Sequence, residues 1–367
     1  MQIRNDLSKI LKSFPVIVLV AILTSPLAHA MSIKWVCKKA TTVQATPVIG
    51  LDGTIYAPGY YLYAVAPDGK VKWWLKNIGT RYGPAAAVGT DGTIYMGGGR
   101  YFRNDPAYLY AISPNGKIKW KFRGVDGDWL APVVGPNGTI YVFTVQTNSS
   151  GDRDLYAITP NGKLKWNFQI GVVQDAVVGP DETIYVASSG FLYAISAAGD
   201  LKWKNIYDTT YGQACKMSIA KDSTLYAASY SGGFKAITAN GQVKWELDGS
   251  WGEKPAIGRN GIIYAMGGYD GRSLCAITPN GQIKWELKPN EQMKRDLDHY
   301  RSPHIGSDGT VYVASIFRLH AITEAGKLKW KLDLLSHSDL AIGKNDIIYL
   351  CGESPSGYGL YAIDPLK

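Results

Sequence analysis

The chain has few of the residues and motifs on which enzyme chemistry most often depends. Only four cysteines and five histidines occur in 367 residues. None of the cysteines forms a C-x-x-C or an adjacent pair, and His299 and His304 lack a third ligand at metal-binding spacing. There is also no P-loop, no G-x-S-x-G and no H-E-x-x-H sequence. We therefore expect neither catalytic residues nor a bound metal.

Long apolar segments are scarce as well. The longest, residues 14–23, is too short to cross a bilayer, which takes about 20 apolar residues. It follows three basic residues and precedes Ala28-His29-Ala30, a pattern typical of signal-peptidase cleavage. We predict a Sec-type signal peptide over residues 1–30, with an uncleaved anchor as the alternative. The protein is then periplasmic or secreted, has no transmembrane segment after processing, and carries no cysteine at the cleavage site for a lipid.

Helical periodicity is almost absent, and short alternating segments take its place. Residues 109–120, LYAISPNGKIKW, predict a β-hairpin with Pro-Asn-Gly as its tight turn. An eighth copy starts at Leu360 and reaches the C-terminus before its Lys-Trp half, whereas Ile33-Lys34-Trp35 stands near the N-terminus without a first half. The seven complete copies begin at Leu62, Leu109, Leu155, Leu192, Phe234, Leu274 and Leu319.

A second hairpin precedes each copy, and its turn and second strand resemble the sequence DGTIY. These segments begin at Asp52, Asp91, Asn137, Asp181, Asp222, Asn260, Asp308 and Asn345. Each repeat thus supplies four short strands, A to D. Eight such repeats predict an all-β fold, an eight-bladed β-propeller of four-stranded antiparallel blades, as a single domain over residues 31–367.

The split repeat indicates how the ring closes. Residues 33–37 would form strand D of the last blade and pair with strand C at residues 360–363. Closure of this kind hides the strand edges that an open array exposes. A linear solenoid is the alternative, but it does not require half a repeat at each end.

The unit LYAI-x-P-N-G-K-x-K-W, with its preceding G-T-I-Y strand, resembles the pyrroloquinoline-quinone (PQQ) type propeller repeat. This repeat occurs in quinoprotein dehydrogenases and in the outer-membrane assembly scaffold BamB. The resemblance covers essentially all of residues 31–367 and is specific for fold, since the shared residues are packing residues. A dehydrogenase would also imply a catalytic Asp, a bound Ca²⁺, an adjacent-cysteine disulfide and long insertions. This chain has no adjacent cysteines, and its longest insertion is about fifteen residues.

The resemblance implies that the tryptophan closing each repeat docks against the neighbouring blade. The matching residues are Trp35, Trp73, Trp120, Trp166, Trp203, Trp245, Trp285 and Trp330. We interpret all eight as structural residues rather than ligand-binding ones.

The variable loops should gather on one face of the ring, because the tight A-B and C-D turns share the other. The crossovers from strand D to the next strand A are rich in aromatic and charged residues. Near the central axis these side chains could line a funnel for a sugar, a peptide strand or a flat ring, or they could simply cap the channel. The candidate ligand-binding residues are Arg81, Tyr82, Asp128, Trp129, Tyr211, Gln213, Trp251, Glu253, Tyr300, Arg301 and His337.

The net charge is +9, and one lysine stands before each repeat tryptophan. Strand alternation predicts that this lysine points to solvent while the tryptophan and the apolar residue before the lysine point inward. We interpret the lysines as protection of the outer strands against aggregation rather than as a nucleic-acid groove. Weak attraction to an anionic cell surface is the alternative. The lysines are Lys34, Lys72, Lys119, Lys165, Lys202, Lys244, Lys284 and Lys329.

The cysteine pairing stays open for Cys37, Cys215, Cys275 and Cys351. Cys37 and Cys351 both belong to the closing blade, but strand C should separate them by too much for a disulfide unless a strand end bends. Cys275 replaces the tyrosine of LYAI and is expected to be a buried thiol.

We expect a monomeric, non-catalytic exported scaffold that binds a protein or glycan partner through its loop-rich face, with no nucleic-acid partner and no cofactor. One alternative is a BamB-like factor in envelope protein assembly. The other is a PQQ-dependent oxidoreductase, which would need PQQ and Ca²⁺.

Overall fold

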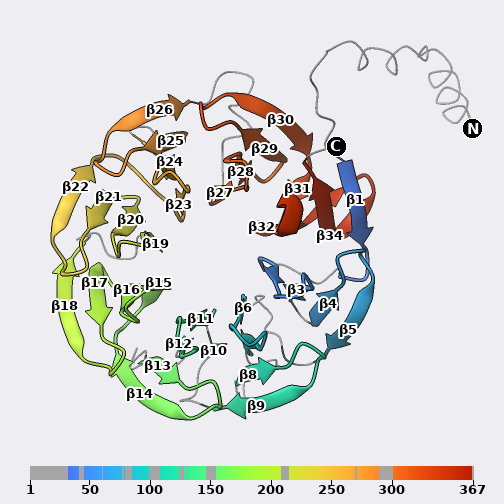
Figure 1. Ribbon diagram of the computed structural model, residues 1–367, viewed down its shortest axis with the longest axis horizontal. Coiled ribbons are helices and arrows are strands. Elements are labelled where there is room, and N and C mark those ends of the chain that lie inside the picture. The colour runs from blue at the N-terminus through green and yellow to red at the C-terminus, as the bar shows by residue number, and fades with distance from the viewer. Residues whose placement is uncertain are drawn as a thin grey trace, which may run out of the picture.

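The protein is an all-β ring of eight sheets (Figure 1). The computed structural model describes residues 32–40, 45–59, 61–76, 78, 85–98, 108–123, 128–129, 131–145, 154–207, 215–268, 271–288 and 301–365. The chain passes through the blades in sequence order, with strand A near the axis and strand D at the rim (Figure 1). The predicted eight-bladed propeller is confirmed.

Every strand pairing within the blades is antiparallel. Blades 1 and 2 comprise β2 (Val48–Ile49), β3 (Ile55–Pro58), β4 (Leu62–Val65) and β5 (Val71–Leu75), then β6 (Ala86–Val88), β7 (Ile94–Gly97), β8 (Leu109–Ile112) and β9 (Ile118–Phe122). Blades 3 and 4 comprise β10 (Asp128–Trp129), β11 (Val133–Val134), β12 (Ile140–Val145), β13 (Asp154–Ile158) and β14 (Leu164–Gln169), then β15 (Val173–Val178), β16 (Ile184–Ser188), β17 (Phe191–Ile195) and β18 (Leu201–Ile206). Blades 5 and 6 comprise β19 (Cys215–Ile219), β20 (Leu225–Ser229), β21 (Gly233–Ile237) and β22 (Val243–Leu247), then β23 (Ala256–Ile257), β24 (Ile263–Gly267), β25 (Ser273–Ile277) and β26 (Ile283–Leu287). Blades 7 and 8 comprise β27 (His304–Ile305), β28 (Val311–Ala314), β29 (Arg318–Ile322) and β30 (Leu328–Asp333), then β31 (Leu335–Ser336), β32 (Ala341–Ile342), the 3₁₀ turn η1 (Lys344–Asp346), β33 (Ile348–Ser354), β34 (Gly357–Asp364) and β1 (Ser32–Cys37).

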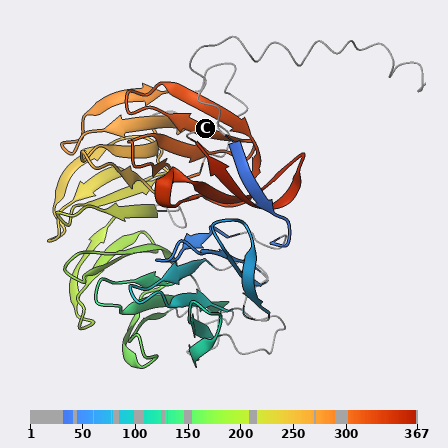
Figure 2. The same ribbon diagram turned by 45° about the vertical axis from the view of Figure 1, so that its right-hand side comes forward.

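Blade 8 closes the ring with strands from both ends of the chain. The N-terminal β1 pairs with β34, so that Ile33 lies opposite Ile363 and Cys37 opposite Leu360. In Figure 2 the blue β1 lies against the red strands of this blade. The predicted closure is therefore confirmed.

A row of three residues crosses each blade on one face. In blade 4, Ala194 of β17 lies opposite Tyr185 of β16 on one side and opposite Trp203 of β18 on the other. The Tyr185 and Trp203 ring centroids are 5.8 Å apart, and the same row occurs in all eight blades at 5.8–5.9 Å. The central alanine of every row is fully buried. A larger side chain there would separate the two rings.

Each of seven of these tryptophans also contacts the C-D turn of the next blade. Trp35 Nε1 donates to Pro67 O at 2.9 Å, and the corresponding bonds from blades 1–6 measure 2.7–2.9 Å. The ring lies on the turn glycine, where a Cβ on Gly69 would come within 2.8 Å of Trp35. Trp330 faces blade 8, whose C and D strands come from opposite ends of the chain. Its buried Nε1 has no hydrogen-bond partner among the described residues.

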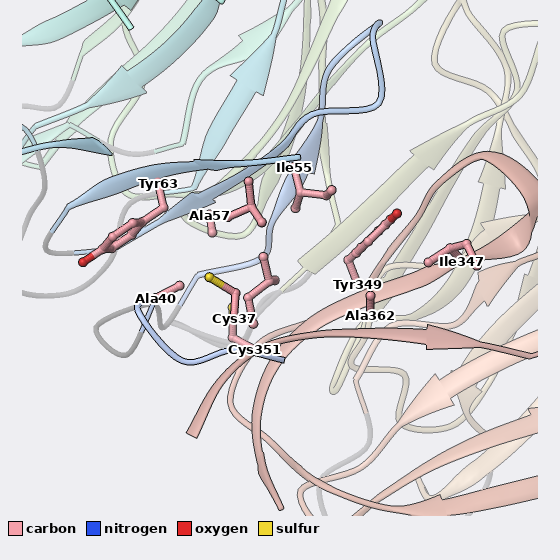
Figure 3. Packing of buried hydrophobic residues seen from close by; sticks show 11 residues of the cluster. Cys37, Ala40, Ile55, Ala57, Tyr63, Ile347, Tyr349, Cys351 and Ala362 are labelled. Carbon is pink, nitrogen blue, oxygen red and sulfur yellow. The ribbon is translucent and has the colours of Figure 1, made fainter. Parts of the chain in front are cut away.

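The apolar core is divided into eight clusters, one between each pair of neighbouring blades. Figure 3 shows the cluster at the closure, where Ile55 and Ala57 of blade 1 face Tyr349 and Ala362 of blade 8.

The four cysteines are buried thiols, and no disulfide joins any two of them. Cys37 and Cys351 both belong to the closure cluster, but they lie opposite Leu360 on its two sides, with strand C between them. Burial raises the pKa of the Cys351 thiol to about 12. Cys275 is completely buried in β25.

The lysine before each repeat tryptophan is exposed, as predicted, but the strand around it does not alternate regularly. In every blade the pairing of strands C and D skips this lysine, which makes it the extra residue of a β-bulge; in blade 4, Ala194 pairs with Trp203 and Ile195 with Leu201. In six blades its Nζ reaches the threonine hydroxyl that precedes strand B, at 2.8–3.2 Å. In seven blades the apolar residue before the lysine is exposed rather than inward, as Leu201 is at 47 %. In blade 1 the corresponding Val71 is half-buried.

Five of these lysines pair with the aspartate of the A-B turn, at 3.0–4.0 Å. Burial would raise the pKa of Asp52, but hydrogen bonds from the Thr54 N–H and hydroxyl and from Lys72 outweigh it and lower that pKa to about 2. The pKa values of the matching aspartates are lowered as well. Most of the lysine ring is thus neutralised within its own blades.

Trp166→Ala should lower the free energy of unfolding by roughly 3 kcal/mol, because it removes the ring contact with Tyr141 and the bond to Ala197 O. Trp74→Ala is the control: this tryptophan is 52 % exposed and should change stability by no more than ~0.5 kcal/mol. Urea denaturation followed by circular dichroism measures both. Equal losses for the two variants would contradict the docking role.

The lowered aspartate pKa values predict acid sensitivity. A carboxyl whose pKa is lower in the folded than in the unfolded state stabilises the fold at any pH above its unfolded-state pKa. This stabilisation is lost as the pH falls through its folded-state pKa. Asp52→Asn should therefore melt below the wild type at neutral pH and converge with it near pH 2. Calorimetric melting across this range is the measurement, with the exposed Asp200→Asn as control. A constant difference between Asp52→Asn and wild type at all pH values would refute this assignment.

Candidate functional site

The two faces of the ring differ in what they carry. The tight A-B and C-D turns lie on one face, here called the turn face. The B-C loops and the D-to-A crossovers lie on the other, here called the crossover face. At the centre, A strands and crossover residues of blades 2–8 line a cavity of about 730 Å³.

The wall of this cavity has an apolar half and a polar half. Blades 2–4 contribute alanine, valine and proline side chains, such as Val88, Val134 and Val177. Blades 5–8 contribute further alanine, isoleucine and proline side chains together with all of the polar and charged ones. The polar and charged residues are Ser218, Lys254, Ser302, His304 and Asp339.

The polar half is built from residues that directly precede or begin a strand A. Ser302 Oγ donates to Glu253 Oε2 at 3.4 Å, which links blades 7 and 6. His304 Nδ1 lies 3.0 Å from Ser302 O and 3.7 Å from Asp339 Oδ1. Since both neighbours are acceptors, this nitrogen carries the ring proton.

Burial raises the pKa of Glu253, and the charge of Asp339 raises it further. Lys216 and Arg301 act in the opposite direction without cancelling the effect. Glu253 is thus a carboxylate held in an unfavourable place by the surrounding fold, which is common at functional sites.

Two cations accompany this carboxylate. Arg301 Nη2 donates to Ser336 O at 3.2 Å, and Lys216 Nζ donates to Gln174 O at 3.4 Å. Arg301 Nε is buried and has no hydrogen-bond partner within the described part of the chain. Both cations are therefore held by backbone carbonyls.

The sequence-based candidates are only partly brought together here. Glu253 and Arg301 interact electrostatically across blades 6 and 7, but neither lines the cavity. Asp128 and Trp129 form β10, which pairs with β12 of blade 3. Five candidates lie outside the described residues: Arg81, Tyr82, Tyr211, Gln213 and Tyr300.

Trp251 and His337 lie away from the central cavity. Trp251 is 1 % exposed and stacks on Phe234 at 5.2 Å, so it belongs to the core between blades 5 and 6 and does not reach the cavity. His337 follows β31 beside strand β33 of blade 8, where it lies 5.0 Å from the Tyr358 ring and 4.0 Å from Glu353 Oε2.

Sequence reasoning missed Lys216, Ser302, His304 and Asp339 as members of one cluster. Their common signal is position, since each lies at or just before a strand A, next to the axis. Among the residues described, no group of three or more potential metal ligands is found. In the same residues, no helix is long and apolar enough to cross a membrane.

Glu253→Gln should raise the melting temperature at neutral pH. A carboxyl whose pKa is raised by folding favours the folded state most when it is protonated, at a pH below its usual pKa of 4.5. This contribution to stability is lost as the pH rises through the raised folded-state pKa. The gain should therefore vanish in acid. Calorimetric melting tests this, with the more exposed Glu353→Gln as control. A variant less stable than the wild type at neutral pH would contradict it.

Comparisons with known proteins agree with this architecture. The family model described as outer membrane protein assembly factor BamB matches residues 58–265 and 214–343. A search of curated proteins finds no match.

Solved structures share the fold at low sequence identity. The crystal structure of BamB from Moraxella catarrhalis is 16 % identical, covers 91 % of this chain and 97 % of its own, and has a TM-score of 0.65. A catalytically inactive virginiamycin B lyase from Staphylococcus aureus with quinupristin is 12 % identical, covers 91 % and 99 %, and scores 0.55. These likenesses show the fold alone. Because the family model spans well over half of the sequence, the chain belongs to the family of outer membrane protein assembly factor BamB.

Proposed function

We propose that the protein is an exported, non-catalytic scaffold in envelope protein assembly, which binds a protein partner through its crossover face. Membership of the BamB family supports the assembly role. The signal-like segment at residues 1–30 supports export. The observation that carries the proposal is a groove on the crossover face between blades 7 and 8.

This groove has a volume of about 600 Å³ and an apolar centre with a charged rim. Phe317 is 53 % exposed and Leu335 37 % exposed. Arg318 and Asp333 form an ion pair at its edge, with Glu353 beside them. Exposed aromatic and aliphatic side chains surrounded by charges are typical of protein interfaces.

The groove is held in shape by the backbone. Leu334 N donates to Phe317 O at 3.0 Å, and Ser336 N donates to Ile316 O at 2.8 Å. The segment around β31 thus bonds to blade 7 on one side and to β33 of blade 8 on the other. A preformed site loses less conformational entropy on binding.

Most exposed apolar residues elsewhere are single residues on the rim. In seven blades one of them, such as Ile118 or Leu201, stands directly before a lysine. Scattered single residues of this kind are normal on a protein surface.

Phe317→Ser combined with Leu335→Ser should abolish capture of the outer-membrane assembly machinery from solubilised envelopes by tagged protein. Affinity purification followed by mass spectrometry measures this. Ile118→Ser, which removes an equally exposed residue from the rim, should leave capture unchanged. If the double variant folds and still captures these components at the wild-type level, the groove is not the docking site; if the wild type captures none, the assembly role is wrong.

A further inference from the structure

The central cavity has features that partner binding in the groove does not use. Its volume of about 730 Å³ lies within the ~300–1,000 Å³ typical of small-molecule sites. One half of its wall is apolar, from blades 2–4, and the other half carries charges of both signs, from blades 5–8. A ligand that fills it should therefore combine apolar groups with charged ones.

The carboxylate that lines the cavity belongs to Asp339. Its Oδ1 accepts a hydrogen bond from Leu340 N at 3.0 Å and lies 3.7 Å from His304 Nδ1. Since a carboxylate has about four acceptor sites, Asp339 keeps acceptor capacity toward a ligand ammonium.

A basic group is likewise available. Lys254 is exposed at the cavity wall, so its ammonium is open to a ligand carboxylate. A carboxylate beside Lys254 would balance an ammonium beside Asp339.

We propose that the central cavity binds a small zwitterionic ligand with apolar side chains, the chemistry of a free short peptide. The ammonium lies by Asp339, the carboxylate by Lys254, and the side chains lie against Val88, Val134 and Val177 of the opposite wall. This site is separate from the proposed partner groove, so each can fail without the other.

Free trivaline is a suitable probe, and titration calorimetry with the purified protein is the measurement. Trivaline should bind, and N-acetylation or C-terminal amidation should each weaken binding by tenfold or more. Asp339→Asn should weaken trivaline binding to a similar extent but leave the binding of N-acetyl-trivaline unchanged, because the substitution and the acetyl group each remove the ion pair between the ligand ammonium and Asp339. Lys254→Gln should likewise weaken trivaline binding but leave the binding of trivaline amide unchanged, because each removes the ion pair between the ligand carboxylate and Lys254.

Asp68→Asn, which changes an exposed acid on the turn face, is the matched control and should bind like the wild type. Circular dichroism melting verifies that each variant is folded. The proposal is overturned if trivaline gives no binding at millimolar concentration. It is also overturned if only one of the two modifications, N-acetylation or C-terminal amidation, weakens binding, or if folded Asp339→Asn binds trivaline with wild-type affinity.

Discussion

The structure depends on the close approach of a tyrosine and a tryptophan across one small residue. In every blade the tyrosine of strand B and the tryptophan of strand D meet over the buried alanine of strand C. The same tryptophan then reaches the C-D turn of the next blade. One side chain therefore stabilises its own sheet and the interface beyond it. Eight repetitions join the sheets into a ring, since each blade buries its apolar faces only against its neighbours.

Ring closure makes this arrangement rigid enough to hold a central site. Strand β1 completes blade 8, so that Trp35 docks on blade 1 as the other tryptophans dock on their neighbours. Only at Trp330, where blade 8 has no continuous C-D turn, is the indole bond missing within the described chain. The fixed ring brings the starts of several A strands together around one axis. Residues from four blades thereby form the polar half of the cavity.

The charged side chains of the two faces differ in their partners. On the turn face, lysines at the strand-D bulges pair with aspartates of the A-B turns and lower the pKa values of these aspartates. On the crossover face, burial raises the pKa of Glu253, and the nearby Lys216 and Arg301 bond to backbone carbonyls. The lysine–aspartate pairs therefore stabilise their own repeats, whereas the fold holds the Glu253 carboxylate at a cost in stability.

The sequence by itself determined the blade number, the strand order and the split last blade, because these follow from local strand periodicity, turn residues and the count of repeats. It did not reveal the bulge in strand D, so Leu201 was wrongly expected to point inward, whereas Lys202 is exposed as expected: one extra residue breaks the alternation of a strand. Only the tertiary structure decided that Trp251 is core and that Glu253, Arg301, Ser302 and Asp339 converge. These residues lie in separate repeats, and their distances depend on how the ring closes rather than on any local pattern.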